Sequence, residues 1–339
     1  MDSAANVVLH IGLHKTGTRY LQRLVLRQLD PARFNVDPLE LIRPLRRAVR
    51  HPGDAAAAGE LEKAVGRWRR SGDRRTLVLS EPHICGDMFS GYHDYAENLQ
   101  LMHQLFPEAR IMYVVRKQAG WLHSAYRQHL ARGKPVPIET FLNFFDGRFH
   151  PRPARKVNGV RNMEALTLPF LAIYRAYAEA YGPGRVYLLR HEDLKRSPDA
   201  FERRLAECLG IERLPDAPTQ RSQNRSYSAL AIGLFHPSTL RRPRPLVSGS
   251  TRPEGRRLPS RLTGPLRRLR RGFIQHVFDR LIYVDWDLLE RGGMREQVER
   301  HYAAENAEIE RIGRLILERG PGAVQLDQSD EPRDEVTGS

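Results

Sequence analysis

Residues 7–19 read VVLHIGLHKTGTR, and this stretch decides the fold class. Its first five residues are apolar except for His10, so they predict a buried strand that ends at Gly12. Beyond the loop, apolar residues recur at helical spacing from Tyr20 to Leu29. A junction of strand, tight loop and helix presents backbone N–H groups and the positive end of the helix to an anion. The sequence therefore predicts an anion-binding loop between the first strand and the first helix.

Three further apolar runs predict strands at residues 76–80, 111–115 and 185–189. Amphipathic helices are indicated between them by apolar residues at helical spacing within 61–68, 99–106 and 170–177. This alternation favours an α/β fold with a mostly parallel central sheet flanked by helices. In such sheets, ligands bind beyond the carboxyl ends of the strands.

The alternation of strands and helices ends at about residue 215. Residues 241–271 are rich in Arg, Pro, Ser and Gly without hydrophobic periodicity, which is typical of a long basic loop. Helical periodicity returns over about 266–319, including a helix expected from Met294 to Arg319. Residues 326–339 are acidic and are predicted to be disordered. We expect residues 1–325 to form a single domain.

Composition narrows the class of protein. The 339 residues include 55 Lys and Arg against 40 Asp and Glu, and the formal net charge of +15 favours anionic partners. Hydrophobic residues make up 40%, which argues against wholesale disorder.

Cys85 and Cys208 have no metal-ligand spacing and indicate a reducing compartment. The amino-terminal apolar stretch is too short for a signal peptide or a membrane span. We expect a cytoplasmic protein with no membrane span.

The residues of the loop suit an anion. Lys15 supplies a cation, Gly17 allows close backbone approach, and Thr16 and Thr18 supply hydroxyls. The order differs from that of nucleotide triphosphatases, in which the lysine follows the glycine and precedes Ser or Thr. No later strand ends in an obvious magnesium-binding aspartate. A plain Gly-Thr turn with a solvated lysine is the alternative, and the position of the loop after the first strand favours the anion site.

The run Lys15-Thr16-Gly17-Thr18-Arg19 resembles the 5′-phosphosulfate loop of sulfotransferases that use 3′-phosphoadenosine 5′-phosphosulfate (PAPS). Many bacterial members of this family have a His-Lys-Thr-Gly-Thr version, and glycan-modifying members also carry arginine at the last position. The resemblance implies a P-loop-like sulfotransferase fold. It also implies that these five residues hold the 5′-phosphosulfate.

A second motif resembles the part of the same family that binds the 3′-phosphate. Arg116 ends the strand at 111–115, Ser124 follows eight residues later, and Tyr126 fits the usual Ser-x-Tyr pattern. An arginine can fork onto phosphate oxygens, and a serine adds a donor. The alternative is a surface arginine and a helix-capping serine. A further stretch, residues 189–194, also resembles the family, although His191 replaces its usual tyrosine.

Catalysis is expected at the ends of the first and second strands. Sulfuryl transfer is an in-line displacement like phosphoryl transfer, and we assign Lys15 to the bridging oxygen, where negative charge develops. The acceptor must lose a proton, and both Glu81 and His83 stand where members of the family carry their base. The glycan-type loop favours Glu81 by analogy, and His83 is the alternative.

The predicted function is therefore transfer of a sulfuryl group from PAPS to a hydroxyl or amine, with adenosine 3′,5′-bisphosphate (PAP) as product and no metal required. A nucleotide kinase or other P-loop phosphotransferase is a second hypothesis. A non-enzymatic anion or nucleic-acid binder centred on residues 241–271 is a third, and it leaves both nucleotide motifs unexplained. The acceptor is a small molecule or a glycan, with the charge hinting at an acidic one. Its identity and the oligomeric state stay open.

Overall fold

A parallel sheet forms the centre of the protein in the computed structural model, which describes residues 6–131, 136–151, 162–215 and 287–324. The strands are β1 (Val7–Gly12), β2 (Phe34–Val36), β3 (Thr76–Ser80), β4 (Arg110–Val115) and β7 (Val186–Arg190). They lie in the order β2-β3-β1-β4-β7, and every neighbouring pair is parallel. The predicted α/β class with a mostly parallel sheet is confirmed.

The predicted strands match the observed ones to within one residue at each end. Side chains of the central strands β1, β3 and β4 are almost all buried, as expected of apolar runs covered on both faces. Strand β2 was not predicted; it is only three residues long and pairs with β3 at the edge. A short antiparallel pair, β5 (Phe144–Phe145) and β6 (Arg148–Phe149), was not predicted either.

Helices cover both faces of the sheet. In the first half of the chain they are α1 (Thr18–Tyr20), η1 (Leu21–Val25), η2 (Leu26–Gln28), α2 (Leu39–Arg50), α3 (Ala55–Arg70), η3 (Pro82–Cys85), α4 (Tyr95–Leu105), α5 (Gln118–Ala131) and α6 (Ile138–Leu142). In the second half they are α7 (Phe170–Tyr181), η4 (Pro183–Arg185), α8 (Asp193–Arg196), α9 (Pro198–Leu209), η7 (Leu288–Gly293), α13 (Met294–His301), α14 (Ala303–Arg319) and η8 (Pro321–Ala323). The helix predicted from Tyr20 to Leu29 is thus three short turns, α, π and 3₁₀ in type.

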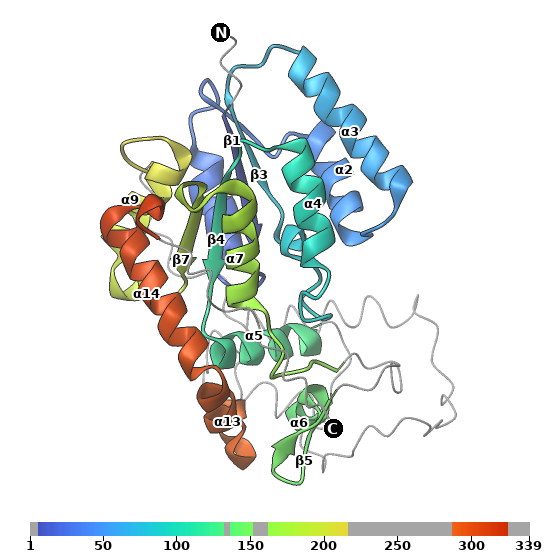
Figure 1. Ribbon diagram of the computed structural model, residues 1–339, viewed down its shortest axis with the longest axis vertical. Coiled ribbons are helices and arrows are strands. Elements are labelled where there is room, and N and C mark those ends of the chain that lie inside the picture. Colours follow the sequence, from blue (N-terminus) through green and yellow to red (C-terminus); the bar gives the residue numbers. More distant parts are fainter. Residues whose placement is uncertain (1–5, 132–135, 152–161, 216–286, 325–339) are drawn as a thin grey trace, which may run out of the picture.

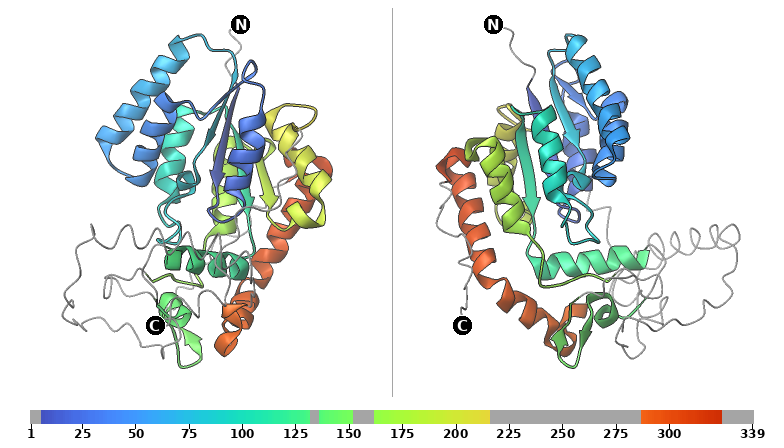
Figure 2. Two further views of the ribbon diagram at one scale, coloured as in Figure 1. Left: turned by 180° about the vertical axis from the view of Figure 1, so that it is seen from behind. Right: turned by 45° about the vertical axis from the view of Figure 1, so that its right-hand side comes forward.

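The arrangement of helices leaves the carboxyl ends of the strands facing α5. Figures 1 and 2 show α7 against one face of the sheet and the segment α1–η1 against the opposite face. Helix α5 runs across below the ends of the strands (Figure 1). Groups at these strand ends therefore lie between the sheet and α5, which is where ligands bind in open parallel sheets.

The carboxy-terminal helices join the same hydrophobic core. The helix expected from Met294 to Arg319 is interrupted at Tyr302, whose hydroxyl donates to Ala165 O at 3.1 Å and accepts the Leu168 N–H at 2.8 Å. The basic loop 241–271, the helical periodicity of 266–281 and the tail 326–339 lie outside the described residues, so the single-domain boundary stays a prediction. Among the described residues, no helix is long and apolar enough to cross a lipid bilayer.

Candidate functional site

The loop between β1 and α1 is folded by its own hydrogen bonds. The Leu13 N–H donates to Val114 O of β4 at 2.7 Å. The hydroxyls of Thr16 and Thr18 both donate to Leu13 O, at 2.7 and 3.2 Å. These hydroxyls, predicted as donors to an anion, are therefore engaged within the loop. What the loop offers to an anion is the backbone N–H groups at the very start of the helical segment, at Thr18 and Arg19, where an N–H has no acceptor inside the helix.

Gly17 marks the start of the helical segment. Its φ of 93° is in the left-handed region, where a glycine is unstrained, and its carbonyl accepts the N–H groups of Tyr20 and Leu21. Lys15 is also left-handed, with φ of 67°, and is half-buried. Arg19 is exposed. The five residues predicted to hold the phosphosulfate thus form one continuous turn at the carboxyl end of β1.

Two buried aromatic side chains hold this turn in position. The backbone N–H of His14 donates to the Tyr92 hydroxyl at 3.1 Å, and the His14 carbonyl accepts the Trp121 indole N–H at 2.8 Å. Tyr92 and Trp121 are both fully buried. Because Trp121 belongs to α5, the loop after β1 is tied directly to the helix that carries the second predicted motif.

The guanidinium of Arg116 lies beside Gly120, near the start of α5. A Cβ at Gly120 would sit 3.1 Å from Arg116 Nε, so the glycine leaves room for the guanidinium. Gly120, Ser124 and Arg127 are spaced i, i+4 and i+7, and therefore share one face of the helix. Burial lowers the pKa of Arg116; the Glu192 carboxylate opposes this effect and the Arg127 cation adds to it. Ser124 thus lies on the helix face between Gly120, which the Arg116 guanidinium contacts, and Arg127.

A small surface pocket lies beside Arg116, where β4 and β7 end against α14. It is lined by Val115, Arg116, Lys117, Arg190, Glu192, Arg196, Asn306, Ile309 and Glu310. Arg190 is committed to Asp193, with bonds of 2.9 and 2.6 Å, and to Glu310 at 3.2 Å. It therefore anchors α14 to β7. Among the described residues, the other cations of the pocket, Arg116, Lys117 and Arg196, show no such pairing with two carboxylates.

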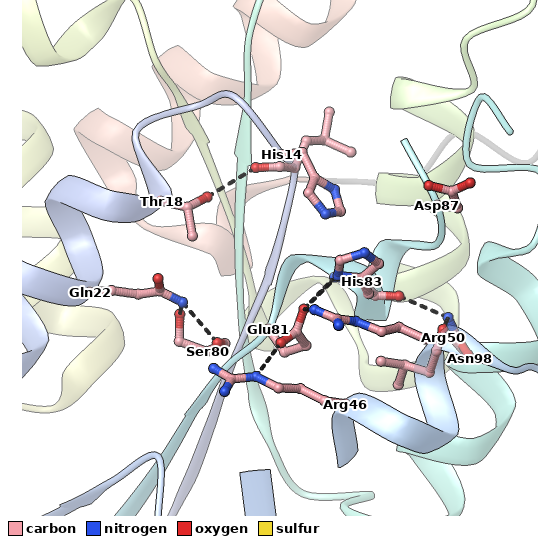
Figure 3. Close-up of polar contacts among 12 residues, drawn as sticks. His14, Thr18, Gln22, Arg46, Arg50, Ser80, Glu81, His83, Asp87 and Asn98 are labelled. Carbon is pink, nitrogen blue, oxygen red and sulfur yellow. Dashed lines mark hydrogen bonds and ion pairs between the residues drawn. The ribbon is translucent and has the colours of Figure 1, made fainter. Parts of the chain in front are cut away.

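Glu81 and His83 follow β3 and contact each other directly. Pro82 starts the short helix η3, and Glu81 caps it by accepting the His83 backbone N–H at 3.3 Å. The same carboxylate oxygen lies 2.6 Å from His83 Nδ1, and its other oxygen accepts Arg46 Nε–H at 2.7 Å (Figure 3). Glu81 is almost completely buried, with 4% of its side chain exposed, whereas His83 is 22% exposed. Only the histidine retains substantial access to solvent.

The environment of Glu81 keeps its carboxylate ionised. Burial alone would raise the pKa, but the hydrogen bonds and charges of His83 and Arg46 outweigh burial and lower it from 4.5 to about 2. A carboxylate with so low a pKa is a weak proton acceptor. An ionised oxygen can only accept a hydrogen bond, so in the neutral ring of His83 Nδ1 carries the hydrogen and Nε2 is the nitrogen that can accept one.

Glu81→Gln is expected to lower the free energy of unfolding by an amount that depends on pH. Because the folded-state pKa lies below the ordinary 4.5, the ion pairs stabilise the fold fully above that pH, and their contribution is lost as the pH falls toward about 2. The pKa shift corresponds to a contribution on the order of 3 kcal/mol to the free energy of unfolding. Urea unfolding of both proteins near neutral pH and in acid measures the difference, which should shrink in acid; a constant difference would contradict the assignment.

His83 faces the loop after β1. Its ring meets that of His14 edge to face, with centroids 4.5 Å apart. Figure 3 shows His83 between Glu81 and His14, with Arg46 on the far side of Glu81. The Asn98 amide holds the backbone of this segment by donating to His83 O at 2.9 Å. The structure therefore brings the predicted base candidates next to the predicted phosphosulfate loop.

Several residues of this site were not predicted from the sequence. Gln22 donates to the Ser80 carbonyl and hydroxyl at 2.9 and 3.0 Å, tying η1 to the end of β3. Arg46 and Arg50 reach Glu81 from α2. Their four-residue spacing on a helix with apolar residues at 41, 42, 45, 48 and 49 is a signal that could have identified α2 and its cationic face.

Comparisons with known proteins give only distant structural likenesses. No protein-family model matches the sequence, and no curated protein matches it. A sulfotransferase from Alicyclobacillus acidocaldarius is 19% identical with a TM-score of 0.43, over 70% of this chain and 93% of that chain. A mouse sulfotransferase complexed with PAP is 15% identical with a TM-score of 0.35, over 88% of this chain and 90% of that one. The sulfotransferase domain from the curacin biosynthetic pathway is 15% identical with a TM-score of 0.34, over 72% of this chain and 94% of that one. Because these scores are low, we derive function from the site itself.

Proposed function

We propose that this protein transfers a sulfuryl group from PAPS to a hydroxyl or amine of an acceptor. The observation that carries the proposal is the order of groups along the carboxyl edge of the sheet. The loop after β1 lies in the middle, Arg116 follows the neighbouring strand β4 on one side, and His83 follows β3 on the other. A nucleotide with anionic groups at both its 5′ and 3′ positions suits the β1 and β4 ends, and an acceptor suits the β3 end.

The loop chemistry favours sulfuryl over phosphoryl transfer. Lys15 precedes Gly17, and no Ser or Thr follows a Gly-Lys pair, so the order that serves magnesium nucleotides is missing. Glu81, the carboxylate at the end of β3, is already engaged by Arg46 and His83. A sulfuryl group carries less charge than a terminal phosphate, which suits a site of one lysine and backbone N–H groups.

PAPS, when bound, supplies the sulfuryl group, and PAP is the leaving group. We assign the base to His83 rather than to Glu81, which the sequence favoured. Glu81 accepts the hydrogen of Nδ1 and fixes the ring, so Nε2 can take the proton of the acceptor. The low pKa of about 2 fits Glu81 for orienting the histidine and not for accepting a proton. Lys15 is assigned to the bridging oxygen, where charge develops as the bond to sulfur breaks.

Ligand-induced thermal stabilisation tests the proposal against both alternatives. PAP at about 100 times its Kd should stabilise the protein by about 2.7 kcal/mol. Stabilisation by ATP with magnesium instead would favour the phosphotransferase, and stabilisation by an oligonucleotide alone would favour the nucleic-acid binder. A screen of hydroxyl and amine acceptors with radiolabelled PAPS then tests the reaction itself.

Arg116→Ala and Ser124→Ala are expected to weaken binding of PAP by roughly 1.5–3 kcal/mol and to leave adenosine 5′-monophosphate almost unaffected. The reason is that only PAP carries a 3′-phosphate for the guanidinium and the hydroxyl. Isothermal calorimetry with both nucleotides measures the difference. Arg185→Ala is the matched control, because this arginine lies at the opposite end of the strands. An equal loss for both nucleotides would show that the two residues do not bind the 3′-phosphate.

A further inference from the structure

Helix α2 places two arginine side chains close to the proposed base. Arg46 and Arg50, one turn apart, both point at Glu81, which is the carboxylate that orients His83. Arg46 Nε donates to Glu81 Oε2 at 2.7 Å, whereas Arg50 lies farther away, at 3.9 Å from Oε1. The two arginines therefore differ in how firmly they are paired.

The positive charge of Arg50 is balanced only weakly by the carboxylate of Glu81. Arg46 also interacts with Asp37, a half-buried carboxylate that directly follows β2, so the charge of Arg46 is shared between two carboxylates. Asp37 itself accepts the Ser80 backbone N–H at 2.7 Å. Within the described part of the chain, the only carboxylate that pairs with Arg50 is Glu81, at the limit of an ion pair. An additional anion would complete the pairing of Arg50.

Arg50 is also accessible on the side where an acceptor would approach. Its side chain is 49% exposed, against 4% for Glu81. Figure 3 shows its guanidinium beside Glu81, on the side of His83, whereas that of Arg46 lies on the other side of Glu81. A group bound to Arg50 would thus lie next to the ring assigned as the base.

We propose that Arg50 binds an anionic group of the acceptor, so that the acceptor carries a carboxylate or another oxyanion near its reacting hydroxyl. This inference rests on the proposed sulfuryl transfer and names the class of acceptor. A guanidinium forms forked, charge-assisted hydrogen bonds to oxyanions, and such bonds fix orientation as well as affinity. Arg50 would hold the hydroxyl of the acceptor against His83 without contacting the sulfuryl group.

The test compares two acceptors that differ only in charge: a glucuronate-containing tetrasaccharide and the same tetrasaccharide after carboxyl reduction. Binding of each to the PAP-loaded protein is measured by calorimetry, and transfer is measured with radiolabelled PAPS. We expect the acidic form to bind at least about tenfold more tightly. Arg50→Gln should remove that preference by raising the Kd and KM of the acidic form about tenfold to hundredfold, with kcat changed far less. Arg50→Lys should retain part of the preference.

Arg43→Gln is the matched control. Arg43 is exposed on the same face of α2, two turns before Arg50, and its removal lowers the net charge equally. It should leave both tetrasaccharides unaffected. Equal effects of the two variants, equal binding of the two tetrasaccharides, or no binding of the acidic one would each overturn the inference. Failure of PAP itself to bind the wild-type protein would instead overturn the proposed function.

Discussion

His83→Ala is expected to lower the kcat of sulfuryl transfer by about 10²–10⁴-fold, the usual contribution of a positioned general base. The variant removes the ring nitrogen assigned to the acceptor proton and leaves Glu81 paired with Arg46. Binding of PAP should be unaffected, because the residues that we assign to the nucleotide lie at the ends of β1 and β4. The measurement is steady-state turnover of the acceptor identified by the screen, with and without added imidazole, which should restore part of the rate.

His51→Ala is the control, because this histidine is exposed at the end of α2 and takes no part in the contacts with Glu81. The pH profile gives an independent readout. If Glu81 were the base, kcat would stay flat as the pH falls until it nears the pKa of that carboxyl, about 2. Full turnover by His83→Ala together with loss of turnover by Glu81→Gln would return the role of base to Glu81.

The fold was predictable from the sequence where apolar runs are long and unbroken. Strands β1, β3, β4 and β7 are buried on both faces, and such strands are apolar along most of their length. Strand β2 gives no such signal, because it has three residues, one of them an asparagine, and only its first is fully buried. Helix α2 contains Pro44, which normally ends a helix, although its buried residues keep helical spacing.

The site was predictable as a set of strand ends but not as a set of contacts. Residues after β1, β3 and β4 must meet at one edge of a parallel sheet, so the proximity of Lys15, His83 and Arg116 to that edge follows from topology. The contact between His83 Nδ1 and Glu81 depends on how the chain turns at Pro82. Arg46 and Arg50 come from α2, some 30 residues earlier in the chain, and their approach to Glu81 is a product of tertiary packing alone.

Lys15→Ala is expected to lower kcat by about 10²–10³-fold, because it removes the side-chain cation assigned to the leaving-group oxygen. The threonine hydroxyls of the loop cannot replace it without giving up Leu13 O, to which both donate. Folding should survive, since lysine and alanine both carry a Cβ and meet the same strain at the left-handed φ of 67°. Urea unfolding of the variant checks this point.

The kinetic pattern separates this role of Lys15 from general attraction of anions. A cation that acts mainly as charge develops in the transition state should lower kcat more than it weakens the binding of PAPS. Lys63→Ala removes an equal charge from the exposed face of α3 and should change neither quantity. If Lys15→Ala turns over like the wild-type protein, or if its whole effect is on PAPS binding, the leaving-group assignment fails, because a group needed for the departure of PAP must contribute to kcat.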